Sequence, residues 1–233
     1  MVSSGCQVGA DDSCEHETES ISVVAIAIDN GAEMRAEVDF DASDRSSFPY
    51  PLQLCDEDEL TIAGEIPERT DRIDRVIYSV NLDSADAPRD IEVSLARKSN
   101  ESVEFTIPVP PAFDVIAPQV GAMVPRAQDF LLEWAPPNTG SQIRIGLAEE
   151  IGFGVCLETS TLEHDYKNMS GVTVDDSGSW TIPAEIVASA DGGECEAIYS
   201  FKRLGPAPYP NAFHEGGFVE GRSERTVAFH SVP

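Results

Sequence analysis

Prolines near the middle of the chain restrict more strongly than any other feature how this sequence can fold. They follow a β-like run that ends at Ile107 and precede a second run that reaches Trp134. Four of them lie in this connector: Pro108, Pro110, Pro111 and Pro118. Because proline fixes φ and has no backbone N–H, the connector can form neither a helix interior nor a central strand. The sequence therefore predicts a stiff spacer between two domains, over residues 14–110 and 111–233.

Length and charge limit what these domains can be. The chain has 233 residues, which is enough for two domains of about 100 residues each. Its net charge of −27, from 42 acidic and 15 basic residues, repels nucleic acid and anionic lipid headgroups. We therefore expect no nucleic-acid partner, and no membrane contact except through a lipid anchor. An acidic, lysine-poor surface is typical of salt-adapted proteins, and a merely acidic exported protein is the other explanation.

The first domain is predicted to consist of short strands. Residues 21–29 form an apolar run, Asn30-Gly31 signals a tight turn, and residues 33–40 then alternate between apolar and charged side chains. Residues 41–52 are predicted to form a loop. Further short runs rich in β-branched residues centre on Thr61, Ile77, Val93 and Phe105. Six short strands separated by turn residues, without helical periodicity, predict a β-sandwich.

The second domain shows the same kind of pattern. Residues 129–137 place Phe130, Leu132 and Trp134 on one face, a Pro-Pro turn follows, and residues 142–148 alternate again. A second hairpin is predicted around the turn at 175–178. Residues 183–193 are the one segment with a helical pattern, because proline can occupy its first turn and glycine ends it. Two alternating strands, at 195–201 and 225–232, complete the predicted domain.

The strand that ends in Trp134 and Pro136-Pro137, followed by a second alternating strand, resembles the opening of a fibronectin type III or related immunoglobulin-like domain. The resemblance covers about 35 residues. It implies an adhesion, spacer or binding module. The predicted fold is therefore all-β, with two tandem immunoglobulin-like or fibronectin type III-like β-sandwiches and one short helix in the second.

The cysteines predict where the protein resides. Two of them, Cys14 and Cys55, precede the proline connector, and two others, Cys156 and Cys195, follow it. An even number in each domain predicts one disulfide per domain and an oxidising, extracytoplasmic compartment. Five reduced cysteines in a cytosolic protein are the alternative. No pair has the C-x-x-C spacing of a zinc ribbon or a thioredoxin site.

The fifth cysteine, Cys6, follows Ser4 and Gly5, and this triplet resembles the end of a bacterial lipoprotein signal, in which the cysteine is acylated. The resemblance departs from the pattern at Ser3, where leucine is usual, and only five residues precede Cys6. It implies a lipid anchor at the outer membrane or cell surface. Residues 1–13 would then form a flexible acidic tether, with poor order extending towards Ser20.

Candidate ligand-binding residues fall into two groups. Asp39, Asp41 and Asp44 offer the hard oxygen ligands that calcium prefers, although a solvated acidic loop is the simpler explanation. Calcium is the only cofactor the sequence suggests. Tyr50 in one proline-rich loop, and Tyr209 and Phe213 in another, could stack on a sugar or anchor a partner protein. Alternatively, these aromatic rings plug the open end of their own sandwich.

The sequence contains no catalytic motif, so the predicted function is a non-catalytic cell-surface interaction or structural module. Its partner would be an extracellular protein or glycan. Two alternatives stay open: an accessory carbohydrate-binding domain or small hydrolase of an extracellular degradative system, and a calcium-rigidified adhesin.

Overall fold

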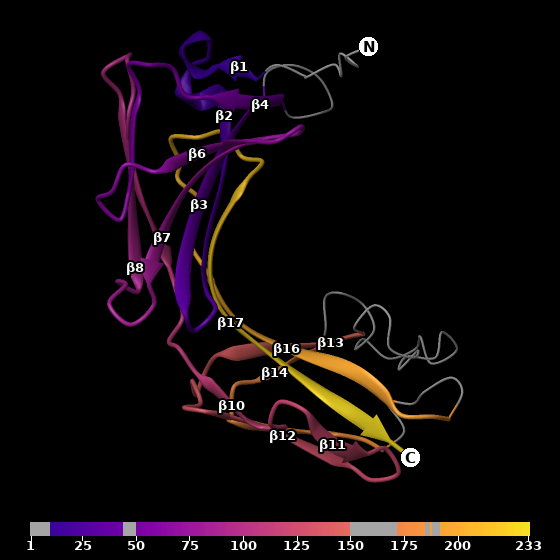
Figure 1. Cartoon of the computed structure of the whole chain (residues 1–233). Coiled ribbons are helices and arrows are strands. Elements are labelled where there is room, and N and C mark those ends of the chain that lie inside the picture. Colours follow the sequence, from indigo (N-terminus) through magenta and orange to yellow (C-terminus); the bar gives the residue numbers. More distant parts are fainter. Residues whose placement is uncertain (1–9, 44–49, 150–171, 185–186, 188–191) are drawn as a thin grey trace, which may run out of the picture. The chain divides into compact units, whose positions relative to one another are not determined.

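A computed structural model describes residues 10–43, 50–149, 172–184, 187 and 192–233. The described chain is almost entirely β-strand and divides into two compact units (Figure 1). Unit 1 comprises residues 1–110 and 205–222, and unit 2 comprises residues 111–204 and 223–233. The predicted all-β fold is confirmed. The predicted helix falls largely on residues 185–186 and 188–191, which lie outside the described residues.

The strands of unit 1 come mainly from the first half of the chain. In order they are β1 (Asp11–Asp12), β2 (Ile21–Asp29), β3 (Glu33–Ala42), β4 (Tyr50–Gln53), β5 (Glu59–Ile62), β6 (Glu68–Asp71), β7 (Val76–Asp83), β8 (Asp90–Ala96) and β9 (Ser102–Pro108). Two 3₁₀ turns, η1 (Ser13–Glu15) and η2 (Thr18–Ser20), connect β1 to β2. Strands β1, β4 and β6 were not predicted; β1 lies within the predicted tether, and β4 overlaps the predicted loop 41–52.

The strands of unit 2 are β10 (Asp114–Ala117), β11 (Ala122–Pro125), β12 (Phe130–Ala135), β13 (Gln142–Glu149), β14 (Val172–Asp175), β15 (Ser179–Ile182), β16 (Cys195–Pro206) and β17 (Phe218–Val232). The last two strands are long because each crosses the boundary between the units. The sequence pattern predicted only their unit 2 portions. Between them, residues 207–217 contain the predicted proline-rich loop around Tyr209 and Phe213.

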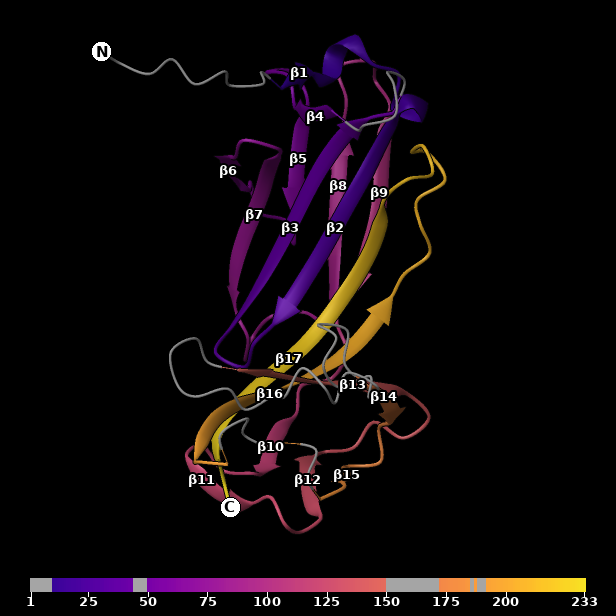
Figure 2. The same ribbon diagram turned by 90° about the vertical axis from the view of Figure 1, so that its right-hand side faces the viewer.

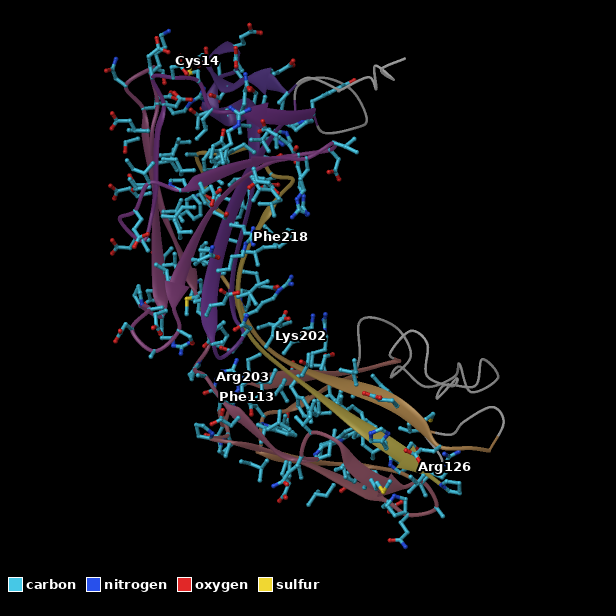
Figure 3. The ribbon with its side chains drawn as sticks, viewed as in Figure 1. Cys14, Phe113, Arg126, Lys202, Arg203 and Phe218 are labelled. Carbon is cyan, nitrogen blue, oxygen red and sulfur yellow. A yellow bond between two sulfur atoms is a disulfide. The ribbon has the colours of Figure 1, made fainter. Side chains whose placement is uncertain are left out.

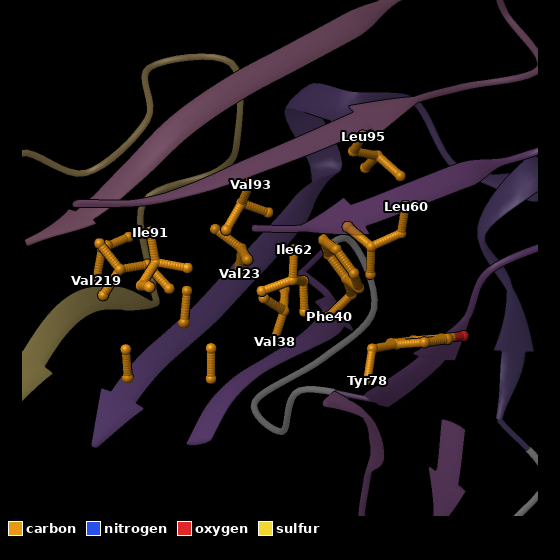
Figure 4. Packing of buried hydrophobic residues seen from close by; sticks show 14 of the residues in the cluster. Val23, Val38, Phe40, Leu60, Ile62, Tyr78, Ile91, Val93, Leu95 and Val219 are labelled. Atoms are coloured by element: carbon orange, nitrogen blue, oxygen red, sulfur yellow. The ribbon is translucent and has the colours of Figure 1, made fainter. Parts of the chain in front are cut away.

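Unit 1 is a sandwich of two sheets whose strands pair mainly in antiparallel fashion. In the larger sheet, β17, β2, β3, β7 and β6 lie side by side, as Figure 2 shows. The predicted β2–β3 hairpin is confirmed, with Ala25 opposite Val38 and Gly31 in the left-handed region at φ 97°. The smaller sheet has the order β5-β8-β9. The predicted inward faces of β3, β7 and β8 are buried between the two sheets, as Val38, Tyr78 and Val93 illustrate in Figure 4.

Residues 205–222 complete unit 1, although the sequence analysis assigned them to the second domain. Val219 and Phe213 from this segment are buried in the unit 1 core. The backbone of Gly217 packs so closely on β2 that a Cβ atom there would lie 1.8 Å from the Val23 carbonyl oxygen. Apolar burial and close backbone approach therefore hold this segment in unit 1, and neither is visible in a local sequence pattern.

Unit 2 has an immunoglobulin-like strand order. One sheet is β10-β12-β15, and the other contains β17, β16, β13 and β14, with β11 paired in parallel to β17. With β11 set aside, this places the first, second and fifth of the remaining strands in one sheet and the others in the second, as in the immunoglobulin fold. The predicted hairpin at 175–178 is wrong, because β14 pairs with β13 whereas β15 pairs with β12. The chain crosses between the sheets at this turn.

The proline connector is not a free spacer. Val109 is 5% exposed in the core of unit 1, and its N–H donates to the Arg89 carbonyl. Phe113 is 2% exposed in the core of unit 2, where the Arg203 guanidinium lies 4.5 Å from its ring centre (Figure 3). The connector forms no helix and no central strand, as predicted: β9 ends at Pro108, β10 lies between Pro111 and Pro118, and both are edge strands. The apolar residues of the connector are nevertheless buried within their own units.

Candidate functional site

A disulfide fastens the N-terminal segment to unit 1. Cys14 and Cys55 are bonded with their Cα atoms 5.9 Å apart, which confirms the predicted pair (Figure 3). Cys195 in unit 2 is also disulfide-bonded. Its predicted partner, Cys156, and the predicted lipidation site, Cys6, lie outside the described residues. Disulfide-bonded cysteines in both units are consistent with an oxidising compartment.

Residues 11–20 are ordered as part of unit 1, which corrects the tether boundary at residue 13 and the expected lack of order up to Ser20. Strand β1 pairs in parallel with β4, opposite Leu52 and Gln53. Ser13, His16 and Thr18 are all buried. The physical reason lies in unit 1 itself, where one buried side chain donates several hydrogen bonds to this segment.

That side chain is Arg97, which is 7% exposed and follows β8. Its guanidinium donates to the carbonyl oxygens of Ser13 and His16, the latter at 3.0 Å, and to the Thr18 hydroxyl at 3.0 Å. These bonds satisfy carbonyl groups of the N-terminal segment that would otherwise be costly to bury. Arg97 therefore orders residues 13–18 against the sandwich.

Asp58 is the acidic partner of Arg97. One of its carboxylate oxygens lies 3.8 Å from the Arg97 Nε and accepts a 2.5 Å bond from the Ser13 hydroxyl. The other accepts the backbone N–H of Lys98 at 2.8 Å. Nearby, hydrogen bonding from the Thr18 hydroxyl holds the pKa of Glu101 below its usual value. The result is a connected polar network between the disulfide and the turn after β8.

A polar cavity of about 200 Å³ lies beside this network. Its lining comes from two segments, residues 14–17 and residues 97–99. The side chains include one buried cation, a lysine, two carboxylates, a histidine and a hydroxyl: Arg97, Lys98, Glu15, Glu17, His16 and Ser99. Such a lining offers hydrogen-bond donors and acceptors to a small polar ligand. We regard this cavity as the candidate functional site.

The predicted calcium ligands are only partly brought together. Asp39 and Asp41 share the outer face of β3, and Asp44 lies outside the described residues. Burial, and then repulsion from Asp41, raise the pKa of Asp39 to about 6, although Arg75 at 3.7 Å opposes this shift. Burial, and then repulsion from Asp74, also raise the pKa of Asp41. The calcium site stays a prediction that rests on two described carboxylates.

Replacing Asp39 with asparagine is expected to stabilise unit 1 at pH 7 by up to about 2–3 kcal/mol. The folded pKa of about 6 lies above the usual value of 3.8. The folded state therefore binds the proton more tightly, and wild-type stability falls as pH rises from about 4 through 6. In denaturant titrations, the stability that Asp39→Asn gains over wild type should be present above pH 6 and vanish near pH 4. The exposed Glu33→Gln variant is the control. Equal pH profiles of stability for wild type and Asp39→Asn would contradict the raised pKa of Asp39.

The calcium prediction has its own test. A melting temperature that calcium leaves unchanged would contradict it.

The three aromatic candidates have different environments. Phe213 is 4% exposed and packs against Phe40 and Phe105, so its ring is not available to a ligand. Tyr209 is half-buried; its hydroxyl accepts the Val23 N–H at 2.8 Å and donates to the His214 carbonyl at 2.9 Å. These two residues plug their own sandwich, which was the alternative explanation. Tyr50 is 40% exposed and stays a candidate contact.

Within the described part of the chain, no helix is long and apolar enough to cross a membrane. Neither protein-family models nor curated proteins match the sequence.

Several solved structures show weak similarity. DIP-gamma IG1+IG2 is 8% identical, with a TM-score of 0.23 over 90% of this chain and 98% of that one. Salmonella alpha-2-macroglobulin reacted with methylamine is 15% identical, with a TM-score of 0.24 over 97% of this chain but only 15% of that one. Bacteroides ovatus SGBP-B, in complex with a mixed-linkage heptasaccharide, is 10% identical, with a TM-score of 0.22 over 95% of this chain and 66% of that one. The function must therefore be argued from the site itself.

Proposed function

We propose that this chain is a non-catalytic interaction module outside the cytoplasm, attached to a cell surface through a lipid on Cys6. The Cys14–Cys55 disulfide carries the proposal, because stable structural disulfides belong to oxidising compartments. The same bond fixes one wall of the polar cavity, so the structure that indicates the compartment also shapes the candidate site. The extracellular partner, a protein or a glycan, would contact unit 1 at this end.

The strongly acidic surface supports the same interpretation. A net charge of −27 keeps the protein soluble and discourages adhesion to anionic lipid headgroups and nucleic acid. A lipid anchor would then supply the membrane attachment that the protein surface does not. Because residues 11–13 are ordered against unit 1, only residues 7–10 separate it from Cys6, and four residues span at most roughly 13–14 Å. The cavity would then lie close to the surface that carries the anchor.

Intact-mass measurement of the protein from its native host tests the proposal. We expect a chain that begins at Cys6 with an acyl-sized increment, and a mass that increases by four hydrogens when two disulfides are reduced. Labelling of intact cells with a membrane-impermeant amine reagent should modify the protein. An unmodified mass with five free thiols would contradict both export and anchoring. Turnover of a glycan or ester substrate by the purified protein would contradict the non-catalytic assignment.

A further inference from the structure

The turn between β2 and β3 contains the one Asn-Gly pair of the sequence (Figure 2). Both residues, Asn30 and Gly31, are exposed to solvent. Such a pair is chemically labile, because the backbone nitrogen of the glycine can attack the side-chain carbonyl carbon of the asparagine, and no β-carbon on the glycine hinders its approach. Whether the folded chain reacts here therefore depends on what holds these two groups.

The reaction has two steps. A C–N bond forms between the Gly31 nitrogen and the Asn30 Cγ, and the Gly31 proton leaves with the side-chain amide group as ammonia, which closes a succinimide ring. Water then opens the ring at one of its two carbonyls, so that residue 30 becomes aspartate or isoaspartate. An isoaspartate would add a backbone atom to the turn, in which the Asn30 N–H donates to the Glu33 carbonyl at 3.1 Å.

Both reacting groups are occupied in the folded chain. The Gly31 N–H donates to Asp29 Oδ1 at 2.8 Å. The Asn30 Oδ1 accepts the N–H groups of Ala32 at 3.0 Å and Glu33 at 2.9 Å. Attack requires the Gly31 nitrogen to lose its proton, and a hydrogen bond to a carboxylate makes that loss less favourable. Ring closure therefore requires these hydrogen bonds to open first.

The Asp29 carboxylate is itself fixed by another part of unit 1. Its side chain is inaccessible to solvent, and it accepts hydrogen bonds from the Ser84 hydroxyl at 2.8 Å and from the Arg89 Nη1 at 2.5 Å. Ser84 and Arg89 belong to the connection between β7 and β8. Turning this carboxylate away from Gly31 would leave buried polar groups unpaired, which is costly. The exposed turn is thus held from below by a buried network.

We propose that Asn30 is a latent deamidation site, which the buried Asp29 carboxylate keeps unreactive in the folded protein. Asp29 acts as a positioning residue, because it engages the nitrogen that would attack and takes no part in the reaction. The inference depends on neither the compartment nor the lipid anchor, so it stands or fails separately from the proposed function.

Two measurements on the wild-type chain test the protection. Peptide mass spectrometry of the full chain, aged at mildly alkaline pH, measures deamidation at Asn30, and the same chain unfolded in urea gives the unprotected rate. We expect the folded chain to react at least about tenfold more slowly, because the turn must open first. In NMR hydrogen exchange, the Gly31 amide should likewise be protected at least about tenfold, although the turn is exposed. Equal deamidation rates, or an unprotected Gly31 amide, would overturn the inference.

A pair of variants separates the Asp29 contact from the general stability of unit 1. Asp29→Ala removes the acceptor of the Gly31 N–H and should raise the deamidation rate of the folded chain at least about fivefold. Phe213→Ala removes a core ring that packs on Phe40 and Phe105, and should leave the rate within about twofold of wild type. A wild-type rate in Asp29→Ala, or equal acceleration by both variants, would refute the role of Asp29. The wild-type measurements decide the question if Asp29→Ala does not fold.

Discussion

Replacing Asp176 with alanine is expected to lower the free energy of unfolding of unit 2 by about 3–5 kcal/mol. The Asp176 side chain is inaccessible to solvent, and that of Arg203 is 1% exposed. The Asp176 carboxylate accepts hydrogen bonds from the Arg203 Nε at 2.6 Å and from the Trp134 indole N–H at 2.7 Å. The alanine variant would leave a guanidinium buried without its counter-charge, which costs far more than the net value of the intact pair.

Acid should remove the stabilisation that the Asp176–Arg203 ion pair gives to the wild-type protein. Burial alone would raise the pKa of Asp176, but the hydrogen bonds from Arg203 and Trp134 outweigh it and hold the pKa below the usual 3.8. The ion pair therefore stabilises the fold fully above pH 3.8, and this stabilisation is lost as pH falls through the lower folded pKa. The difference between wild type and Asp176→Ala should persist at pH 5 and shrink only under stronger acid.

Tryptophan fluorescence in a denaturant titration measures this effect, because both tryptophans, Trp134 and Trp180, belong to unit 2. The neighbouring carboxylate of Asp175 is exposed, and Asp175→Ala should change stability by no more than about 0.5 kcal/mol. A double variant, Asp176→Leu with Arg203→Met, should recover much of the loss, because it removes both charges. A loss below about 1 kcal/mol in Asp176→Ala would show that Arg203 finds sufficient compensation in its carbonyl contacts.

The buried Arg97 and Arg203 could have been noticed in the sequence, because each occupies the next inward-facing position of an alternating strand. Ile91, Val93 and Leu95 face the core of unit 1, and two residues further along that series lies Arg97. The series of β16 likewise runs through Tyr199 and Phe201 to Arg203. A charged residue at an inward position predicts a buried partner. The sequence could not name the partners, because the Ser13 carbonyl that Arg97 contacts lies 84 residues away.

Local patterns predicted the strands well and the connections between them poorly. The alternation of β3, β7, β8, β12 and β13 identified their buried faces, because a sheet with one buried face imposes a period of two. The turn at 175–178 suggested a hairpin, since Ser-Gly suits a tight turn. The buried Asp176 in this turn instead contacts Trp134 of β12 and Arg203 of β16, which belong to opposite sheets. Tertiary contacts thus decided the topology.

The cavity itself was beyond prediction for the same reason. No local pattern joins residues 14–17 with residues 97–99, since the first were expected at the end of a tether and the second between two strands. The cysteine count did predict the Cys14–Cys55 bond, and that bond brings one wall of the cavity to the sandwich. An aromatic residue was the expected signal for a binding site, whereas the observed lining is polar.

Replacing Phe213 with alanine is expected to lower the free energy of unfolding of unit 1 by about 3–5 kcal/mol. The ring is 4% exposed, with its centre 6.1 Å from that of Phe40 and 6.4 Å from that of Phe105. Removing it deletes buried apolar surface and leaves a cavity between the two sheets. It also loosens residues 205–222, whose backbone contacts β2 through the bond from the His214 N–H to the Ile21 carbonyl, at 2.8 Å.

Hydrogen exchange separates this effect from a general loss of stability. In Phe213→Ala the amides of His214 and Val23 should exchange faster, because the first bonds to β2 directly and the second donates to Tyr209 of the same segment. Phe218→Ala is the matched control, since its ring is 45% exposed and its loss should cost less than about 1 kcal/mol. Equal destabilisation by the two variants would mean that residues 205–222 are not part of the unit 1 core. If Phe213→Ala alone is strongly destabilised, unit 1 depends on a segment that lies about 100 residues beyond its other strands, and residues 1–110 do not suffice for its fold.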